Sequence, residues 1–124
     1  MRAVPFRLPE VPAQTDLVAK YFRGLGDATR LRILETLAEE GELSVGELVE
    51  RLGQLQPQVS NHLACLRWCG FVVARREQRS VYNRIADERV IQMVELGRAI
   101  LADNAEHVAA CCRIDGRAQA ITHG

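Results

Sequence analysis

The sequence predicts an α+β fold that is mainly α with a β-hairpin, built from about five helices plus a two-stranded wing. Apolar residues recur at helical spacing through most of the chain, with capping residues and glycines at the expected ends. Between residues 71 and 85 the pattern changes to two short runs rich in Val, Tyr, Phe and Ile. Two short helices joined by a four-residue turn and followed by such a hairpin make a winged helix-turn-helix.

The composition limits the class of protein. A chain of 124 residues with 48% hydrophobic residues fits one compact domain, whereas a disordered polymer would be less apolar. No stretch approaches the roughly 20 apolar residues of a membrane helix, and the N-terminus lacks the apolar region of a signal peptide. We therefore expect a cytoplasmic protein with no membrane partner. Thiols stay reduced there, so the four cysteines indicate metal ligands or redox groups before disulfides.

Polar side chains mark the beginnings of the first three helices. Thr15 is a candidate cap of the first helix, and Asp27 is a candidate cap of the second. Ser44 and Glu47 form a capping-box pattern, in which each side chain accepts a hydrogen bond from the other residue's exposed backbone amide. The short third helix that they open is expected to end at Gly53.

The fourth helix follows the turn at residues 53–56. It is expected to begin at Pro57, because proline in a first helical position lacks only an amide that would have no partner. It is predicted to run to about Trp68, with Gly70 as a left-handed C-cap.

Two strands and a last helix complete the expected fold. The strands are residues 71–76 and 80–85, joined by residues 77–79. Asp87 is placed to cap the last helix. The apolar stripe of that helix comprises Val90, Met93, Val94, Gly97, Ile100 and Leu101.

The balanced charge, with 16 basic and 16 acidic side chains, hides an uneven distribution. Residues 35–50 hold six acidic side chains and no Lys or Arg, whereas residues 67–84 hold five arginines and the single acid Glu77. One interpretation is a solvated hairpin whose charges protect an exposed sheet edge from aggregation. The other is a wing whose arginines contact phosphate or the minor groove of DNA. The adjoining helix favours the second interpretation.

The fourth helix has an apolar side and a polar side. Val59, Leu63 and Leu66 cluster on one side and are expected to face the core. The opposite side offers amides, which can pair bidentately with adenine in the major groove. His62 lies nearer the core edge, so a packing or phosphate-contacting role is favoured over a metal role. The candidate DNA-binding residues are Gln56, Gln58, Ser60, Asn61, His62, Arg67, Arg75, Arg76, Arg79 and Tyr82.

Cys65 and Cys69 are four residues apart on this helix, so their side chains are neighbours. Thiolate–metal bonds of roughly 2.3 Å or a little longer allow one ion to bridge such a pair. The alternative is that both are small apolar residues packed against another surface, such as the terminal arm or a partner helix. A metal ion held at this end of the helix would change the position of the helix and its fit to DNA.

Cys111 and Cys112 follow the last helix, and either is a candidate third thiolate. Three thiolates favour soft ions such as Cd(II), Pb(II), Hg(II) or As(III) over hard ions such as Mg(II). A closed Zn(II) site would need a fourth ligand, such as the other vicinal cysteine or His107.

An ordered set of motifs resembles the ArsR/SmtB family of metal-responsive repressors over roughly residues 17–105. The motifs are Leu25-Gly26-Asp27-Ala28-Thr29-Arg30-Leu31-Arg32-Ile33-Leu34, Val59-Ser60-Asn61-His62-Leu63, Leu66-Arg67, Gly70-Phe71-Val72 and the wing ending in Tyr82. The resemblance implies a homodimer whose first and last helices build the interface, bound to operator DNA without metal and released by metal. The sequence pattern and the resemblance together predict a flexible N-terminal arm at 1–14, a DNA-binding and dimerisation domain at 15–110 and a tail at 111–124 that carries the vicinal cysteines.

The cysteines indicate which branch of the family the chain resembles. Arsenic sensors of the family often carry a Cys-x-Cys pair where this chain has Ser44-Val45-Gly46. The zinc, cobalt and nickel type has an Asp/His ligand set on the last helix. This chain retains Asp87 but has Arg89 and Ile100-Leu101 in place of the histidines. Cys65 and Cys69 are similar to those of the CmtR-like cadmium- and lead-sensing branch. That resemblance implies a third ligand from the C-terminal region of the other subunit, with Cys111 the best match and Cys112 next. The vicinal pair leaves mercury or arsenite as alternative inducers.

The sequence therefore predicts a repressor that binds an inverted-repeat operator in double-stranded DNA as a homodimer and is released by a soft metal ion, with Cd(II) or Pb(II) favoured. One alternative keeps the fold but makes the thiols a redox switch. Another is a winged-helix module that binds protein rather than DNA. No nucleophile–base pair, phosphate loop or paired carboxylates indicate an enzyme, and no small-molecule organic substrate is expected.

Overall fold

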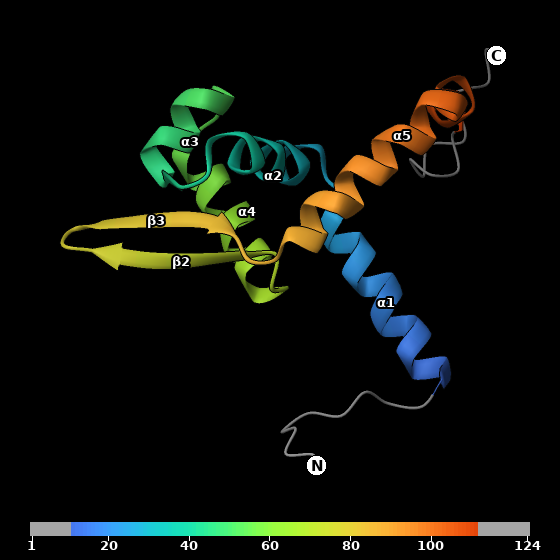
Figure 1. Ribbon diagram of the computed structural model, residues 1–124, viewed down its shortest axis with the longest axis horizontal. Helices are drawn as coiled ribbons and strands as arrows, with labels where there is room; N and C mark the ends of the chain where they lie inside the picture. The colour runs from blue at the N-terminus through green and yellow to red at the C-terminus, as the bar shows by residue number, and fades with distance from the viewer. Residues whose placement is uncertain (1–10, 112–124) are drawn as a thin grey trace. The chain divides into compact units, whose positions relative to one another are not determined.

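The computed structural model describes residues 11–111, in eight elements (Figure 1). They are α1 (Val11–Leu25), α2 (Ala28–Glu40), β1 (Leu43–Ser44), α3 (Val45–Leu52), α4 (Gln56–Trp68), β2 (Val72–Glu77), β3 (Ser80–Ile85) and α5 (Glu88–Ala110). The described chain forms two compact units, one up to Ile91 and one from Gln92 onward. The predicted winged helix-turn-helix, with five helices, is confirmed.

The first helix begins earlier than expected. α1 begins at Val11, four residues before Thr15, so Thr15 is an exposed helical residue and not the cap. Pro12 occupies the second helical position, where the missing amide would have had no helical partner. Residues 11–14 of the expected arm are therefore helical, and residues 1–10 lie outside the described part.

The other predicted caps are confirmed. The Asp27 carboxylate accepts a hydrogen bond of 3.0 Å from the backbone amide of Arg30. Ser44 and Glu47 form both bonds of the capping box, at 3.2 Å and 2.9 Å. The Asp87 carboxylate accepts a 2.8 Å hydrogen bond from the Arg89 amide at the start of α5. These caps depend on residues two or three positions apart, so they form wherever the chain turns into a helix.

The two ends of α4 follow standard helix chemistry. The helix begins at Gln56, so Pro57 is its second residue and not its first. At the other end Gly70 adopts a left-handed φ of 84°, as predicted. Its amide bonds to the Arg67 carbonyl at 3.1 Å, and the amide of Phe71 bonds to the Leu66 carbonyl at 2.9 Å. Together these bonds form a Schellman motif, which turns the chain sharply from α4 into the wing.

The wing is a long hairpin that extends beyond α3 and α4 in Figure 1. β2 and β3 are antiparallel, with Arg75 opposite Tyr82, and β2 begins at Val72, one residue later than expected. The predicted two-stranded sheet has a third member, because β1 pairs antiparallel with β3 and places Leu43 opposite Asn83. A strand of two residues is too short to show an alternating pattern, so the sequence did not indicate it.

The core lies between the helices and the base of the sheet. Val59, Leu63 and Leu66 of α4 are completely buried, which confirms the predicted core face of that helix. The other buried apolar residues are Leu25, Ile33, Leu34, Leu37, Leu43, Leu48, Phe71, Val72 and Val90. The core thus packs against one face of α4 and leaves the opposite face accessible to solvent.

Outside this core, α1 and α5 carry exposed apolar side chains. On α1 they are Val18, Tyr21 and Phe22, and on α5 they are Leu96, Ile100, Leu101 and Val108. The regular helical backbone of α5 is interrupted at Asn104, whose φ is −131°. None of the helices described, α1 to α5, is both long and apolar enough to cross a membrane.

Candidate nucleic-acid interface and thiol pair

The exposed face of α4 begins with side-chain amides. Gln56, Gln58 and Asn61 are exposed, and Ser60 is half-buried beside them. The buried Val59 holds the same turns against the core. Amides presented on the first two turns of a helix can reach base edges in a major groove. The structure therefore brings together the four polar residues that were predicted from this half of the helix.

His62 is held against α2. Its Nδ1 lies 3.3 Å from Nη1 of Arg30 and 3.9 Å from Oδ1 of Asp27. Burial raises the pKa of Asp27, but the hydrogen bond from the Arg30 amide and the charges of His62 and Arg30 lower it on balance. The arrangement corresponds to the packing role that was weighed for His62.

Arg30 joins the end of α1 to α4. Its Nε donates a 2.6 Å hydrogen bond to the Gly24 carbonyl, and Nη2 donates a 3.4 Å bond to the Arg23 carbonyl. Carbonyls at the end of a helix have no helical partner, so an arginine that caps them stabilises the last turn. Because the same guanidinium also contacts His62, the Arg30 side chain connects the end of α1 to the recognition helix α4.

The wing contacts part of the acidic segment. Arg75 Nε lies 2.8 Å from a carboxylate oxygen of Glu42, and its Nη1 lies 2.7 Å from Glu77. Its guanidinium also stacks 5.1 Å from the centre of the Tyr82 ring. Glu42 lies 3.8 Å from Arg84 as well, and the hydrogen bond from Arg75 is the main cause of the lowered pKa of Glu42. The positive charge of the wing is thus partly neutralised at its base.

Arg76 and Arg79 lie farther along the hairpin. Both are exposed, and neither forms an ion pair with a residue between 11 and 111. Arg76 stands opposite Val81, and Arg79 lies in the turn between the strands. Among the arginines of the hairpin, those without an ion pair to residues 11–111 therefore lie toward its tip.

The two cysteines of α4 lie together at its C-terminal end and are both half-buried. Burial raises the pKa of the Cys69 thiol, and Cys65 raises it further through its charge and a hydrogen bond. A Cβ on Gly24 would stand 3.3 Å from Cys69 Sγ and 3.4 Å from Phe71 Cε2. The surface that covers this thiol is therefore α1 of the same chain.

Two adjacent thiols fit part of a soft-metal site. Cys111 is half-buried directly after α5, and Cys112 lies outside the described residues. In the described part of the chain, no three His, Cys, Asp or Glu side chains are grouped so that they could hold an ion. His107, a candidate fourth zinc ligand, is exposed on α5.

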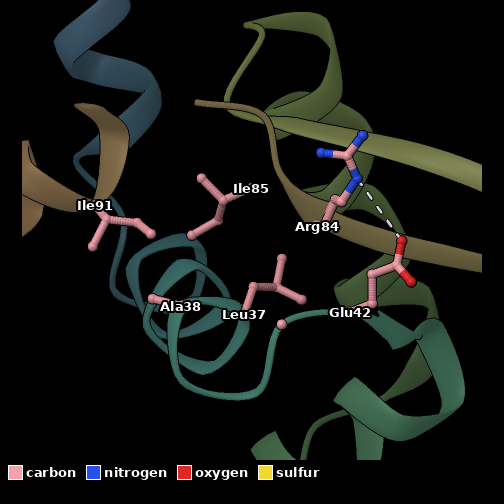
Figure 2. A pocket seen from close by; sticks show the side chains of 7 residues that line it. Leu37, Ala38, Glu42, Arg84, Ile85 and Ile91 are labelled. Carbon is pink, nitrogen blue, oxygen red and sulfur yellow. Dashed lines mark ion pairs between the residues drawn. The ribbon is translucent and has the colours of Figure 1, made fainter. Parts of the chain in front are cut away.

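The unit that ends at Ile91 has a hollow of about 480 Å³. Figure 2 shows the side chains that line it, with the Glu42–Arg84 ion pair among them. Its lining residues are Leu37, Ala38, Gly41, Glu42, Arg84, Ile85 and Ile91. A smaller hollow of about 320 Å³ is lined by Ala64, Arg67 and Trp68, and 89% of the Trp68 surface is exposed.

The sequence from α2 to the start of β2 matches a family of bacterial regulators. The profile described as bacterial regulatory protein, arsR family, matches residues 27–73. A Streptomyces lividans protein named probable mercury resistance operon repressor is 42% identical over 111 residues, which cover 89% of this chain and 88% of that protein. The chain belongs to the ArsR family.

This ArsR-family chain is also similar to the regulator CmtR of Mycobacterium bovis, with 43% identity over 86 residues that cover 68% of this chain and 72% of CmtR. A solved homodimeric winged helix-turn-helix DNA-binding domain from Mycobacterium bovis has a TM-score of 0.68 and 34% identity, covering 77% of this chain and 88% of that one. Membership in a family of DNA-binding regulators confirms that the chain is not an enzyme.

Sequence reasoning did not assign a role to several residues of this ArsR-family interface. Arg30, Glu42 and Asn83 contact predicted site residues, but their partners are 32, 33 and 16 positions away in the chain. Arg30 lies inside the sequence motif on which the family resemblance rests, and that was the one feature of the sequence that could have pointed to its role. Glu42 counted only as one member of the acidic segment.

Proposed function

We propose that this ArsR-family protein is a metal-responsive transcriptional repressor that is released from operator DNA when Cys65 and Cys69 bind a soft ion. The observation that carries the proposal is the position of this thiol pair at the C-terminal end of α4. The N-terminal half of the same helix presents its amides to solvent. One rigid helix thus joins a ligand-binding end to a DNA-reading end.

In the DNA-bound state, Gln56, Gln58, Ser60 and Asn61 read the major groove, and the wing contacts the backbone or the minor groove. The charge of the wing supports this division, since Arg76 and Arg79 have no ion pair among residues 11–111. Arg75 and Tyr82 stack on each other at the base of the wing. For these residues to contact DNA, Arg75 must either break its ion pair with Glu42 or contact Glu42 and DNA at the same time.

Two thiolates do not complete a soft-metal site, so a third is proposed from Cys111 or Cys112. Cd(II) and Pb(II) are the favoured inducers, and Hg(II), As(III) and Zn(II) are the alternatives. The name of the Streptomyces relative, a repressor of a mercury resistance operon, supports Hg(II) as a serious candidate. The relation to CmtR supports the pair on α4 as the anchor of the site.

Contacts around Cys69 provide a route from the thiols to the DNA-reading end. The thiol touches α1 at Gly24, and the Gly24 carbonyl accepts a hydrogen bond from Arg30. Arg30 in turn meets His62, which lies beside Asn61 on α4. A Cβ on Gly24 would already stand 3.3 Å from Cys69 Sγ, so an ion bound on that side of the sulfur would displace α1 from α4. That movement reaches α4 through Arg30 and changes its fit to DNA.

The exposed apolar residues of α1 and α5, including Phe22 and Ile100, support a homodimer built from these two helices. The solved M. bovis domain is homodimeric by its description. A symmetric dimer would bind an inverted repeat with half-sites about 10–11 bp apart or a multiple of that. The proposed organisation is residues 11–110 as the DNA-binding and dimerisation domain, followed by a cysteine-bearing tail, in the cytoplasm.

A gel-shift release experiment on the promoter of the protein's own operon tests the proposal. Cd(II), Pb(II), Hg(II), Zn(II) and arsenite are titrated against wild type, Cys65→Ser and Cys69→Ser. Both variants are expected to bind DNA as wild type does and to lose release by the inducing ion. Ala64→Ser, on the same helix but outside the proposed DNA contacts, is the control that keeps both DNA binding and release. Normal release of both cysteine variants by every ion would overturn the thiol site.

The second candidate function is a thiol-redox repressor, which the proximity of Cys65 and Cys69 favours. The raised pKa of Cys69 opposes it, because redox-sensing cysteines react as thiolates. Thiol counting after mild peroxide, beside an ultraviolet titration of thiolate–metal charge transfer, separates the two candidates. Loss of two thiols together with loss of DNA binding would support the redox function.

A further inference from the structure

Asn83 is the only polar side chain that is fully buried in the part of the chain that the structure describes, with 0% of its surface exposed. It lies in β3, opposite Leu43 of the short strand β1. Its Nδ2 donates a 3.2 Å hydrogen bond to the Leu43 carbonyl. Burying an amide costs free energy unless its donors and acceptors are paired, so a buried Asn at this position needs an explanation.

The other end of the amide meets the recognition helix. Oδ1 of Asn83 accepts a 3.3 Å hydrogen bond from Nη1 of Arg67, in the last turn of α4. Arg67 is itself exposed. Asn83 thus joins three elements, with β1 on one side, its own strand β3 in the middle and α4 on the other side.

The acceptor that holds Arg67 is neutral. Arg75 and Arg84 meet the carboxylate of Glu42, which cancels much of their charge. Arg67 has no ion pair with any residue from 11 to 111, and its described side-chain partner is the Asn83 amide. An amide oxygen fixes the direction of a guanidinium and leaves its full positive charge available for a phosphate. A carboxylate in the same place would fix the side chain and neutralise it.

We propose that Asn83 is a positioning residue that aims Arg67 at a DNA phosphate, next to the end of α4. The inference rests on the proposed DNA interface and adds to it a buried residue that never touches DNA. Holding Arg67 in one orientation removes the conformational freedom that it would otherwise lose on binding DNA. The benefit appears in DNA affinity, and a purely structural role for Asn83 would appear in folding stability alone.

A double-mutant cycle on the full-length protein tests the proposal. DNA affinity is measured by fluorescence anisotropy over a range of KCl concentrations for wild type, Asn83→Leu, Arg67→Ala and the double variant. Asn83→Leu is expected to lower the affinity by about threefold to tenfold. Arg67→Ala is expected to reduce the slope of log K against log salt by about one. In the Arg67→Ala background, Asn83→Leu is expected to have no further effect on affinity.

Asn83→Asp is the second variant, because it keeps an acceptor for Arg67 at the same size. It is expected to hold Arg67 but to cancel its charge, so the salt slope falls by about one as in Arg67→Ala. Asn61→Leu, at a proposed base contact, is the matched control. Its loss of DNA affinity is expected to add fully to the loss caused by Arg67→Ala. Thermal unfolding of each variant separates folding from binding.

Independent effects of Asn83→Leu and Arg67→Ala would overturn the positioning role, as would wild-type affinity and salt slope in Asn83→Asp. If Arg67→Ala binds DNA as wild type does, the phosphate contact is wrong, although the ArsR-family fold and its DNA binding stand. The metal proposal is untouched by any of these results, since no metal is added. Failure of wild type to bind duplex DNA would instead refute the proposed interface as a whole.

Discussion

The Sγ atom of Cys69 lies 3.3 Å from the point where a Cβ on Gly24 would stand, so a helix of the N-terminal part touches the recognition helix at its thiol. The aromatic ring of Phe71 approaches the same point to 3.4 Å, and Tyr21 packs on that ring with 4.5 Å between centroids. Gly24 is buried as well. Any group that enlarges this contact must move α1 or α4.

Gly24→Ala is expected to crowd Cys69 and to lower the free energy of unfolding by about 1 kcal/mol. Overpacking costs about 1–3 kcal/mol, and the better helix propensity of alanine offsets up to about 1 kcal/mol of it. In a Cys69→Ala background the same change is expected to be neutral or stabilising, because the sulfur is gone. Urea unfolding measures both values. Gly46→Ala, whose Cβ would lie 3.9 Å from the Ser44 hydroxyl, is the uncrowded control.

Arg30→Lys is expected to keep the ion binding of the thiols and to weaken the release from DNA that it causes. Lysine retains the charge but cannot bond to the Gly24 carbonyl and His62 in the same way. Ultraviolet titration measures ion binding, and gel shift measures release. Arg32→Lys, an exposed position on the same helix, is expected to behave as wild type. Full release by Arg30→Lys would show that the signal travels by another route.

Glu42→Gln is expected to strengthen DNA binding and to steepen its salt dependence. The substitution removes the carboxylate that pairs with Arg75 and Arg84, which frees positive charge at the base of the wing. Each further phosphate that these arginines neutralise adds about 0.9 to the slope against log salt. Glu50→Gln removes one exposed acidic charge that faces Arg51, and therefore controls for the change in net charge. An equal increase in affinity in the two variants would mean that the pairing with Arg75 has no special effect.

We expect the contribution of Asp87 to folding stability to be lost in acid. Hydrogen bonds from the side chain and amide of Arg89 lower the pKa of Asp87 from 3.8 to about 2. Because the folded-state pKa is the lower one, the carboxylate stabilises the fold above about pH 4, and this contribution disappears as the pH falls to about 2. Asp87→Asn is therefore expected to be less stable than wild type at pH 7 and equal to it near pH 2. Urea midpoints across this range measure the difference.

Local sequence patterns were enough to predict the helices, the hairpin and the core face of α4. The caps at Asp27, Ser44 and Asp87 and the left-handed Gly70 depend on hydrogen bonds between residues a few positions apart. Such interactions are encoded in local spacing and can be recognised without the fold. The start of α1 is the exception, because residues 11–14 are already helical before Thr15, the cap that the sequence suggested.

The way in which the predicted site residues are held depends on contacts between elements, which local patterns do not predict. The contact of Arg30 with His62, of Arg75 with Glu42 and of Asn83 with Leu43 join residues 32, 33 and 40 positions apart. Composition showed an acidic segment and a basic hairpin, but not that one carboxylate reaches across to two arginines. Periodicity likewise placed the cysteines away from the α4 core face without revealing that α1 packs against Cys69. Which side chains meet across elements depends on how those elements pack, and no local pattern carries that information.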